Sequence, residues 1–334
     1  MPLDLDATHP STPRSAGAAA HPVARLSGPP RQGRRARRIV SLLPSATEIV
    51  AALGLTDRLV GITHECDHPP GIGHLPRLTG DLTTGGGTSR EIDTAVREAL
   101  TDGHGLYRLD APELAALQPD LVLTQELCSV CAVAYPAVME AARLTGGGED
   151  EPLVVSLEPH RLEDVFASIE LVARLCNAQE AGSELLGRLR HRLSSVQRTT
   201  VTQRAALVEW LDPLFAPGHW VPDQLTAAGA RSVFGASGAR SVESSWEALA
   251  EADPDVVILG LCGFDLARTR AEWAAFDPPT ALQSTRAWAD GEIWALDGSA
   301  YVSRPGPRLV DGVEIMAEIL RGTAAHRAFR LPTT

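Results

Sequence analysis

Short apolar runs alternate with amphipathic stretches along most of this chain. The first run, residues 39–43, is followed by Pro44 and by an apolar helical stretch that ends at Gly54. Short apolar runs bounded by turn residues are typical of buried strands, and strands that alternate with helices form a parallel sheet. The pattern therefore predicts an α/β fold, with further strands at residues 58–63, 120–124, 153–157, 205–209, 256–259 and 293–296.

The clearest helical periodicity lies in the middle of the chain. Apolar residues recur at helical spacing over residues 162–176, and again from about residue 178 to Val196 after an interruption at Asn177. The second helix would be roughly 30 Å long, the width of a domain, at ~1.5 Å per residue. Residues 117–123 and 251–259 also share a helix–turn–Pro–Asp–strand plan, as two similar lobes would. We predict two parallel-sheet α/β lobes joined by a long rigid helix, divided as an N-terminal lobe at 38–158, connecting helices at 159–198 and a C-terminal lobe at 199–334.

Two segments lack this regular pattern. Residues 1–37 are rich in Pro, Ala, Ser and Arg and show no apolar periodicity, so we expect a disordered arm outside the fold. Residues 83–105 contain three consecutive glycines and one short amphipathic piece, and we interpret them as a surface insertion. The glycines are more typical of a loop than of a phosphate cradle, because the flanking elements do not fit a dinucleotide fingerprint.

The composition excludes several classes of protein. None of the 334 residues is lysine, so pyridoxal enzymes, P-loop ATPases and kinases, which depend on a lysine, are ruled out. The formal net charge is −12, which disfavours nucleic acid and anionic lipid as partners. No apolar run reaches the ~18 residues needed to span a bilayer, so we expect no membrane-embedded segment.

The start of the chain predicts a cytoplasmic location. Residues 1–30 offer no apolar stretch of the length that a secretory signal needs. A competing interpretation takes the basic cluster at 31–38 and the apolar residues 39–55 as a signal behind a misassigned start, which would place the protein outside the cytoplasm. Pro44 and Glu48 interrupt that stretch, and a carboxylate is costly inside an inserting segment.

Candidate chemistry gathers after the predicted strands, where parallel α/β sheets bind their ligands. Four of the five cysteines, Cys66, Cys128, Cys131 and Cys262, fall on such loops. Thiolate and imidazole groups bind Zn, Cu or a metal-centred cofactor, so these four are candidate metal ligands. Two alternatives stay open: Cys128 and Cys131 form a redox pair at a helix start, or each cysteine is a small buried hydrophobe.

Aromatic side chains also lie on loops, in the second half of the chain. Trp210, Phe215, Trp220, Phe264 and Tyr301 follow predicted strands there, although the whole chain has only six Trp, three Tyr and six Phe. Around a cleft they would offer flat contact to a large ring ligand; the alternative is that they pack the loops together. No nucleophile elbow, zinc-protease helix or Walker pattern occurs, so nothing indicates catalysis.

An ordered series of segments resembles the periplasmic binding-protein family for vitamin B12 and iron chelates, the substrate-binding components of ABC importers. The resemblance covers roughly residues 38–321, and its most specific segments are 38–48, 67–70, 117–122, 246–249, 254–255 and 303–308. It implies a class III substrate-binding protein, with the ligand in a cleft between two lobes and an ABC importer permease as partner.

The resemblance also suggests roles for particular residues. In cobalamin-binding members an aromatic residue just before the Asp-x-Pro-Pro stretch touches the corrin, and Glu65 holds that place here. Tyr301 and Phe215 match two other aromatic positions, whereas Glu113 and Glu247 correspond to carboxylates that dock on the importer. Together with the loop analysis, this predicts a ligand site formed by Ser45, Glu65, Cys66, Glu126, Phe215, His219, Trp220, Phe264, Tyr301 and Arg304.

Our leading hypothesis is a monomeric, non-enzymatic binder that holds a metal chelate, cobalamin or another corrinoid, between two lobes. A second hypothesis is a thiol-based enzyme that uses Cys128 and Cys131. A third is a carrier of Zn or another transition metal, which would contain stoichiometric metal and no coloured cofactor.

Overall fold

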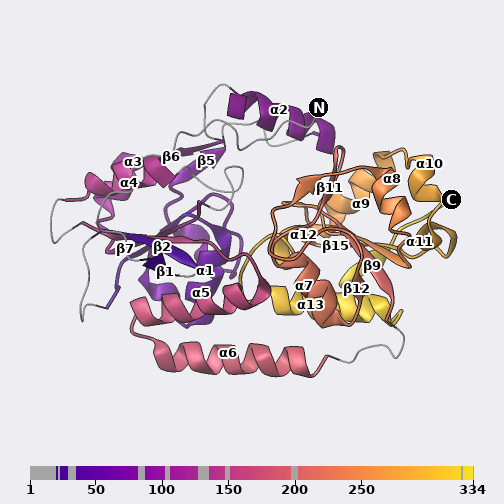
Figure 1. The fold of residues 1–334 in the computed structure, drawn as a ribbon. Helices are drawn as coiled ribbons and strands as arrows, with labels where there is room; N and C mark the ends of the chain where they lie inside the picture. Colours follow the sequence, from indigo (N-terminus) through magenta and orange to yellow (C-terminus); the bar gives the residue numbers. More distant parts are fainter. Residues whose placement is uncertain are drawn as a thin grey trace.

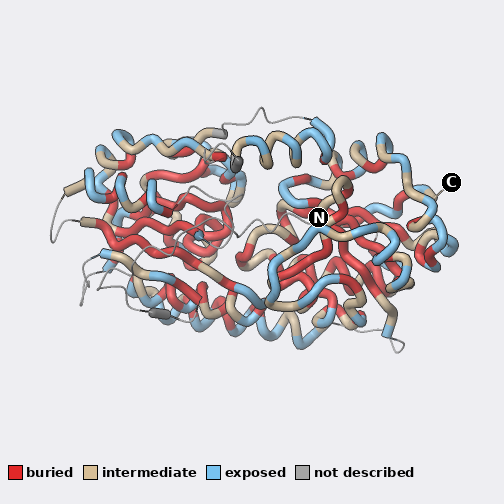
Figure 2. Tube along the Cα trace, turned by 45° about the horizontal axis from the view of Figure 1, so that its top comes forward, coloured by how far each residue is buried: buried red, intermediate tan, exposed pale blue. Residues whose placement is uncertain are grey.

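The computed structural model describes residues 20–21, 23–28, 35–81, 87–101, 106–126, 135–146, 151–196, 202–324 and 326–333. They form two α/β lobes that stand side by side, with two long helices that lie mainly beneath the N-terminal lobe and reach the junction (Figure 1). Each lobe has its own buried interior, seen as two separate buried regions in Figure 2. The two-lobed α/β architecture predicted from the sequence is confirmed.

The N-terminal lobe contains a six-stranded sheet in the order β1-β2-β8-β7-β3-β4. Four of its strands are parallel neighbours: β8 (Leu153–Leu157), β7 (Leu121–Thr124), β3 (Ile39–Ser41) and β4 (Leu59–Ile62). Successive side chains of a strand point to opposite faces of the sheet. Both faces are covered by helices, so residues are buried on both sides. One face packs against α1 (Pro44–Ala52), α5 (Leu162–Leu175) and α6 (Gln179–Ser194), and the other against α3 (Ala111–Ala116) and α4 (Tyr135–Arg143).

The predicted disordered arm is wrong for residues 24–27. They form β2 (Ala24–Ser27), which pairs antiparallel with β8 from Ala24 opposite Leu157 to Ser27 opposite Val154, and β1 (Ala20–His21) pairs with β2. An edge strand exposes a row of unpaired N–H and C=O groups, and a short extended segment can satisfy them. Four residues are too few to show a hydrophobic period, so the sequence pattern did not reveal this strand.

The C-terminal lobe is built on a five-stranded sheet in the order β12-β9-β14-β15-β16. Its parallel strands are β12 (Arg231–Ser232), β9 (Arg204–Val208), β14 (Val256–Leu259) and β15 (Ile293–Leu296), and β16 (Ala328–Arg330) closes the edge antiparallel. Helices α7 (Val221–Ala228) and α13 (Leu309–Leu320) cover one face. The other face packs against α8 (Trp246–Glu251), α9 (Leu266–Ala275), α10 (Thr280–Gln283) and α11 (Arg286–Ala289).

Several smaller elements accompany the two main sheets. A hairpin of β10 (Trp210–Leu211) and β11 (Leu214–Ala216), joined by β13 (Val242–Glu243), follows β9, and the one-turn helix α12 (Gly298–Tyr301) follows β15. In the N-terminal lobe, β5 (Thr79–Asp81) pairs antiparallel with β6 (Tyr107–Leu109). Between these two strands runs α2 (Ser89–Thr101), which lies at the top of Figure 1 and belongs to the predicted surface insertion. Single 3₁₀ turns stand at Thr56–Arg58 and Ile72–His74.

The connection between the lobes is a pair of antiparallel helices, α5 and α6. The chain leaves the first helix at Asn177, which has a φ of 52° and so ends it, and α6 then runs back toward α13 of the second lobe. The interruption predicted at Asn177 is therefore confirmed. Where the two helices meet, Gly182 of α6 faces Ala173 of α5.

Residues 39–55 are part of the interior of the N-terminal lobe. Ile39 in β3 and Ile49 and Val50 in α1 are completely buried. This stretch is therefore part of the folded lobe, and the location of the protein stays a prediction. Within the described ranges, no helix combines the length and the apolar character needed to cross a membrane.

The contact between α5 and α6 predicts opposite effects on stability when two glycines of α6 are replaced by alanine. A Cβ at Gly182 would lie 2.6 Å from the Cβ of Ala173, whereas a Cβ at Gly187 would have nothing within 4 Å. Gly182→Ala should therefore lower the free energy of unfolding, by about 1–3 kcal/mol. Gly187→Ala should raise it by about 0.5–1 kcal/mol, because alanine stabilises a helix interior. Urea unfolding measures both, and equal gains in the two variants would contradict the close approach of α5 and α6.

Candidate ligand cleft

The carboxyl ends of the two parallel sheets face each other across the junction of the lobes. Arg304, just after α12, reaches the loop that follows β4, where it donates hydrogen bonds to Asp67 and to the backbone oxygen of Glu65. This contact places the loops after β4 and β15 side by side. Ligands of parallel α/β sheets bind beyond the strand ends, so the space between these loops is the candidate cleft.

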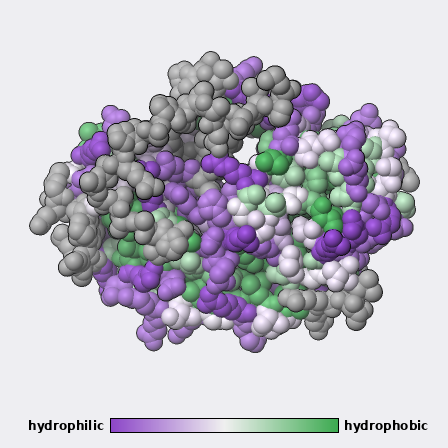
Figure 3. Space-filling model, in the orientation of Figure 1, coloured by the Kyte–Doolittle hydropathy of each residue, from purple (hydrophilic) through white to green (hydrophobic). Residues whose placement is uncertain are grey.

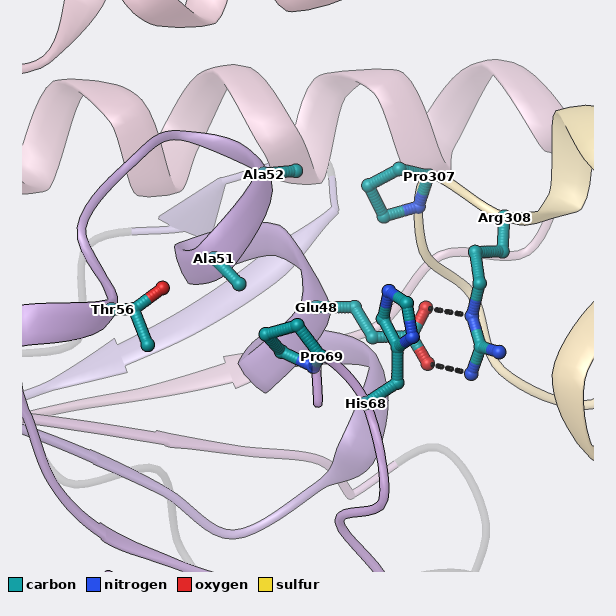
Figure 4. A pocket seen from close by; sticks show the side chains of 8 residues that line it. All are labelled: Glu48, Ala51, Ala52, Thr56, His68, Pro69, Pro307 and Arg308. Carbon is teal, nitrogen blue, oxygen red and sulfur yellow. Dashed lines mark hydrogen bonds and ion pairs between the residues drawn. The ribbon is translucent and has the colours of Figure 1, made fainter. Parts of the chain in front are cut away.

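A buried ion pair joins the lobes at the floor of this region. Arg308, the residue before α13, donates from Nε and Nη2 to the two carboxylate oxygens of Glu48 in α1, at 3.0 and 2.5 Å (Figure 4). The side chain of Glu48 is only 2% exposed, so water cannot solvate this carboxylate. Burial makes the charge of each partner depend on the other. The pair therefore holds α1 of one lobe to the start of α13 of the other.

A second ion pair lies directly beside the first. Arg304 donates to both oxygens of Asp67, at 2.5 and 3.2 Å, and its Nη1 is 3.6 Å from Glu48 Oε1. Although burial alone would raise the pKa of Asp67, the hydrogen bonds and the charge of Arg304 hold that pKa below its ordinary value. Arg304 was predicted to bind ligand, but here its guanidinium is engaged by the opposite lobe and its side chain is 12% exposed.

A small pocket lies beside the buried pair but does not coincide with the predicted site. Its volume is about 280 Å³, below the usual range for sites that enclose a drug-sized ligand. None of the residues predicted to bind ligand lines it. Its lining residues, shown in Figure 4, are Glu48, Ala51, Ala52, Thr56, His68, Pro69, Pro307 and Arg308.

Three predicted residues lie on the N-terminal side of the cleft. Glu65 is exposed after β4, and the hydroxyl of Tyr107 donates to its Oε1 at 3.3 Å. Glu126 is exposed after β7 and pairs with Arg25 of β2 at 2.9 Å. Ser45 is buried in the first turn of α1. Of the two exposed carboxylates on this side, that of Glu126 is already paired with an arginine.

His219 is the polar group most affected by burial on the C-terminal side. Its ring lies 5.8 Å from that of His160, which follows β8, and 5.6 Å from Trp220. Its backbone φ is 47°, unusual for a residue other than glycine, and its buried Nδ1 has no hydrogen-bond partner among the residues that the structure describes. Burial, with the charges of His160 and Arg240, lowers the pKa of His219 to about 4, so the imidazole is neutral at pH 7. A neutral imidazole can bind a metal centre.

The predicted aromatic residues fall into two groups. Phe215 in β11 and Tyr301 in α12 are half-buried at the inner end of the lobe. Trp220 is 6% exposed and donates from Nε1 to the oxygen of Val302 at 2.8 Å. Phe264 is 2% exposed, covered by Arg268 at 3.9 Å and met edge-on by Trp210 at 5.2 Å. Trp220 and Phe264 therefore pack inside the lobe, in agreement with the alternative interpretation that the aromatic residues hold the loops together.

The structure describes two of the four cysteines proposed as metal ligands. Cys66 is buried and shares a hydrogen bond with Thr47 Oγ1 at 3.0 Å, and burial raises its pKa to about 11 in spite of that bond. Cys262 is exposed after β14. Cys128 and Cys131 lie outside the described residues. Within the described part of the chain, no three His, Cys, Asp or Glu side chains come together as metal ligands.

The two predicted docking carboxylates occupy equivalent places in the lobes. Glu113 lies in the first turn of α3, which precedes β7, and Glu247 lies in the first turn of α8, which precedes β14. Both are exposed. Helices α3 and α8 lie on the same upper side of the molecule in Figure 1.

Sequence reasoning did not assign the residues that join the lobes, Glu48, Asp67 and Arg308. A signal was present, since all three lie in segments 38–48, 67–70 and 303–308 that carry the family resemblance. Charged residues within such specific segments were the available clue. Their pairing was not visible, because Glu48 and Arg308 are 260 positions apart.

Comparison with known proteins agrees with this architecture. A family model described as "Periplasmic binding protein" matches residues 39–292. The vitamin B12-binding protein of Vibrio cholerae is 23% identical over 86% of this chain and 90% of that protein. An uncharacterized ABC transporter substrate-binding lipoprotein of Bacillus subtilis is 22% identical over 84% of this chain and 79% of that protein. The crystal structure of a periplasmic heme-binding protein from Pseudomonas aeruginosa superposes with a TM-score of 0.62 at 23% identity, over 87% and 94% of the two chains.

The buried pair makes a prediction about stability. Glu48→Gln or Arg308→Met alone leaves the other side chain without its hydrogen-bonded counter-charge, so each should cost up to about 3–5 kcal/mol in the free energy of unfolding, less where Arg304 or Asp67 compensates. The double variant should lose less than the sum of the two. Arg188→Met removes an exposed pair with Glu184 and should cost under about 0.5 kcal/mol. Urea unfolding of all four proteins measures the coupling, and strictly additive losses would show that the two side chains act independently.

Burial also predicts an order of thiol reactivity. Iodoacetamide at pH 7 should modify Cys262 well before Cys66 or Cys176, because burial raises the pKa of both of the latter to about 11. Peptide mapping at successive times measures each rate separately. In urea the three thiols should react at similar rates. Fast modification of Cys66 in the folded protein would contradict its burial.

Proposed function

Because the chain belongs to the periplasmic binding protein family and is a substrate-binding protein of the branch that takes vitamin B12, heme and iron chelates, we propose that it holds one corrinoid between its lobes. The main support for this proposal is that the carboxyl ends of the parallel strands in the two lobes face each other. The lobes are joined at the floor of the space between them by Glu48 and Arg308. Such a floor fixes one side of a cleft that is walled by loops from both lobes.

The charges at the cleft favour a corrinoid over heme. A corrin ring carries neutral amide side chains at its edge, whereas heme carries two carboxylates. Glu65 is exposed on the N-terminal wall, and a carboxylate accepts hydrogen bonds from amides but repels other carboxylates, whereas the charge of Glu126 is already met by Arg25. Arg304 and Arg308, which would attract a carboxylate, are already paired with Asp67 and Glu48. The name of the Vibrio cholerae relative agrees with this choice.

The C-terminal wall supplies groups that suit a flat metal chelate. Tyr301 and Phe215 are half-buried at the inner end of the lobe and offer ring surface. His219 is neutral at pH 7 and has one ring nitrogen without a partner. In this proposal Tyr301 contacts the face of the ring, and His219 is a candidate for the metal at its centre.

The proposed role is binding and delivery, without catalysis. The described thiol nearest the site, Cys66, is buried with a raised pKa, which disfavours the thiolate that a thiol-based enzyme needs. The exposed carboxylates Glu113 and Glu247, one on each lobe, are the proposed contacts with an ABC importer permease. Members of the family work with such permeases.

Titration with cyanocobalamin tests the proposal. We expect one equivalent to bind, with a change in the absorption of the corrin, and hemin to compete weakly. Tyr301→Ala should weaken binding roughly tenfold, because a lost aromatic contact is worth about 1 kcal/mol or more. Phe329→Ala on the outer strand β16 is the matched control and should bind normally. Tight binding of hemin with none of cyanocobalamin would overturn the corrinoid assignment.

A further inference from the structure

Helix α2 belongs to the N-terminal lobe by chain connection, but it makes its contacts on the other lobe. It runs between β5 and β6, a pair of strands that stands at the N-terminal wall of the cleft. Thr79 of β5 is 2.7 Å from His64 Nδ1, and Tyr107 of β6 donates to Glu65. The base of the insertion is therefore fixed beside the proposed ligand wall.

The first turn of α2 is held by the C-terminal lobe. The backbone nitrogen of Ser89 donates to Glu272 Oε1 of α9 at 2.7 Å, and Trp210 Nε1 donates to the oxygen of Ser89 at 3.1 Å. Arg268 of α9 donates to the oxygen of Gly87 at 3.3 Å. Ser89 is completely buried by these contacts.

Two ion pairs extend this attachment along the helix. Arg90 pairs with Asp212, in the turn between β10 and β11, at 2.6 Å, and Arg97 pairs with Glu243 of β13 at 2.8 Å. Ile92 packs against the core of the C-terminal lobe beside Trp210. All of these partners come from the second lobe, so α2 crosses from one wall of the cleft to the other.

The position of α2 puts it opposite the buried floor. Figure 1 shows the helix at the top, above the junction of the lobes and on the side away from α5 and α6. The cleft is thus bounded by α2 on one side and by the pairs of Glu48 and Asp67 with Arg304 and Arg308 on the other.

The two boundaries differ in how easily they break. The side chains of Arg90 and Glu243 are 74% and 55% exposed, so their ion pairs are solvated and screened by salt. Figure 3 shows hydrophilic residues, in purple, at the surface on this upper side of the molecule. Glu48, in contrast, is buried with its partner. Opening should therefore begin at α2, while the floor stays closed.

We propose that α2 is a latch, which has to release the C-terminal lobe before a ligand can enter or leave the cleft. The inference rests on the proposed function only for the identity of that ligand. Exchange through the latch becomes faster whenever the contacts of Arg90 and Arg97 weaken, so it also becomes faster with rising salt concentration.

The test first reverses the charges on the C-terminal lobe that hold the latch, and then reverses one partner charge on α2. The starting protein carries Tyr301→Cys with Cys128, Cys131 and Cys262 changed to Ser, so that the new thiol reports access to the cleft. A bulky neutral maleimide is the probe. Asp212→Arg with Glu243→Arg should speed its labelling about tenfold, and adding Arg90→Glu should restore part of the protection. Arg188→Glu on α6 is the control and should label at the starting rate. Equal rates in all four proteins would overturn the latch, whatever the ligand is.

Binding kinetics in the native-cysteine background extend the test to the corrinoid. The charge-reversed variant should raise the association and dissociation rates of cyanocobalamin by a similar factor, because a gate changes access in both directions. A rise in dissociation alone would assign α2 to the ligand site instead and would contradict the gate. Failure of cyanocobalamin to bind the unaltered protein would refute the corrinoid proposal, and the labelling result would still decide the latch.

Discussion

The pairing of Glu48 with Arg308 is the contact on which the geometry of this protein depends. A carboxylate that is 2% exposed cannot keep its charge without a partner, and the partner comes from the other lobe. Arg304 and Asp67 extend the pair, and Val310, just beyond Arg308 in α13, packs into the core of the N-terminal lobe. Charge and apolar contact therefore act at the same place. They hold the two sets of strand ends face to face, and any ligand site between the lobes follows from that arrangement.

Both boundaries of the cleft are held by ion pairs between arginine and carboxylate side chains, but the two boundaries differ in how far water reaches these pairs. At the floor, the carboxylate of Glu48 is excluded from water and its pairing with Arg308 is costly to break, although Asp67 beside it is exposed. At α2, similar pairs are exposed to solvent, where screening makes them weak. A binding protein needs both, because a fixed floor preserves the shape of the site and a breakable contact admits the ligand. In the function that we propose, the exposed carboxylate of Glu65 favours a ligand with neutral, hydrogen-bonding edges.

Much of the architecture could be predicted from local patterns. The strands at residues 153–157, 256–259 and 293–296 have the predicted bounds, and the break at Asn177 separates α5 from α6 as expected. These features repeat or stop within a few residues, so periodicity detects them. The strand at residues 24–27 was missed because its stability comes from the edge of β8 rather than from its own sequence. The loops after strands were located correctly, but not the direction of their side chains, and Trp220 and Phe264 lie inside the lobe.

The sequence by itself determined two α/β lobes, their connection by helices and the loops at which a ligand site could form, because hydrophobic period and turn residues act over short distances. Only the tertiary structure decided which charges meet. Glu48 and Arg308 are 260 positions apart, Ser89 and Glu272 are 183 apart, and no local pattern relates such residues. Their partners are selected by burial, since a charge removed from water has to find its counter-charge wherever the fold brings one near.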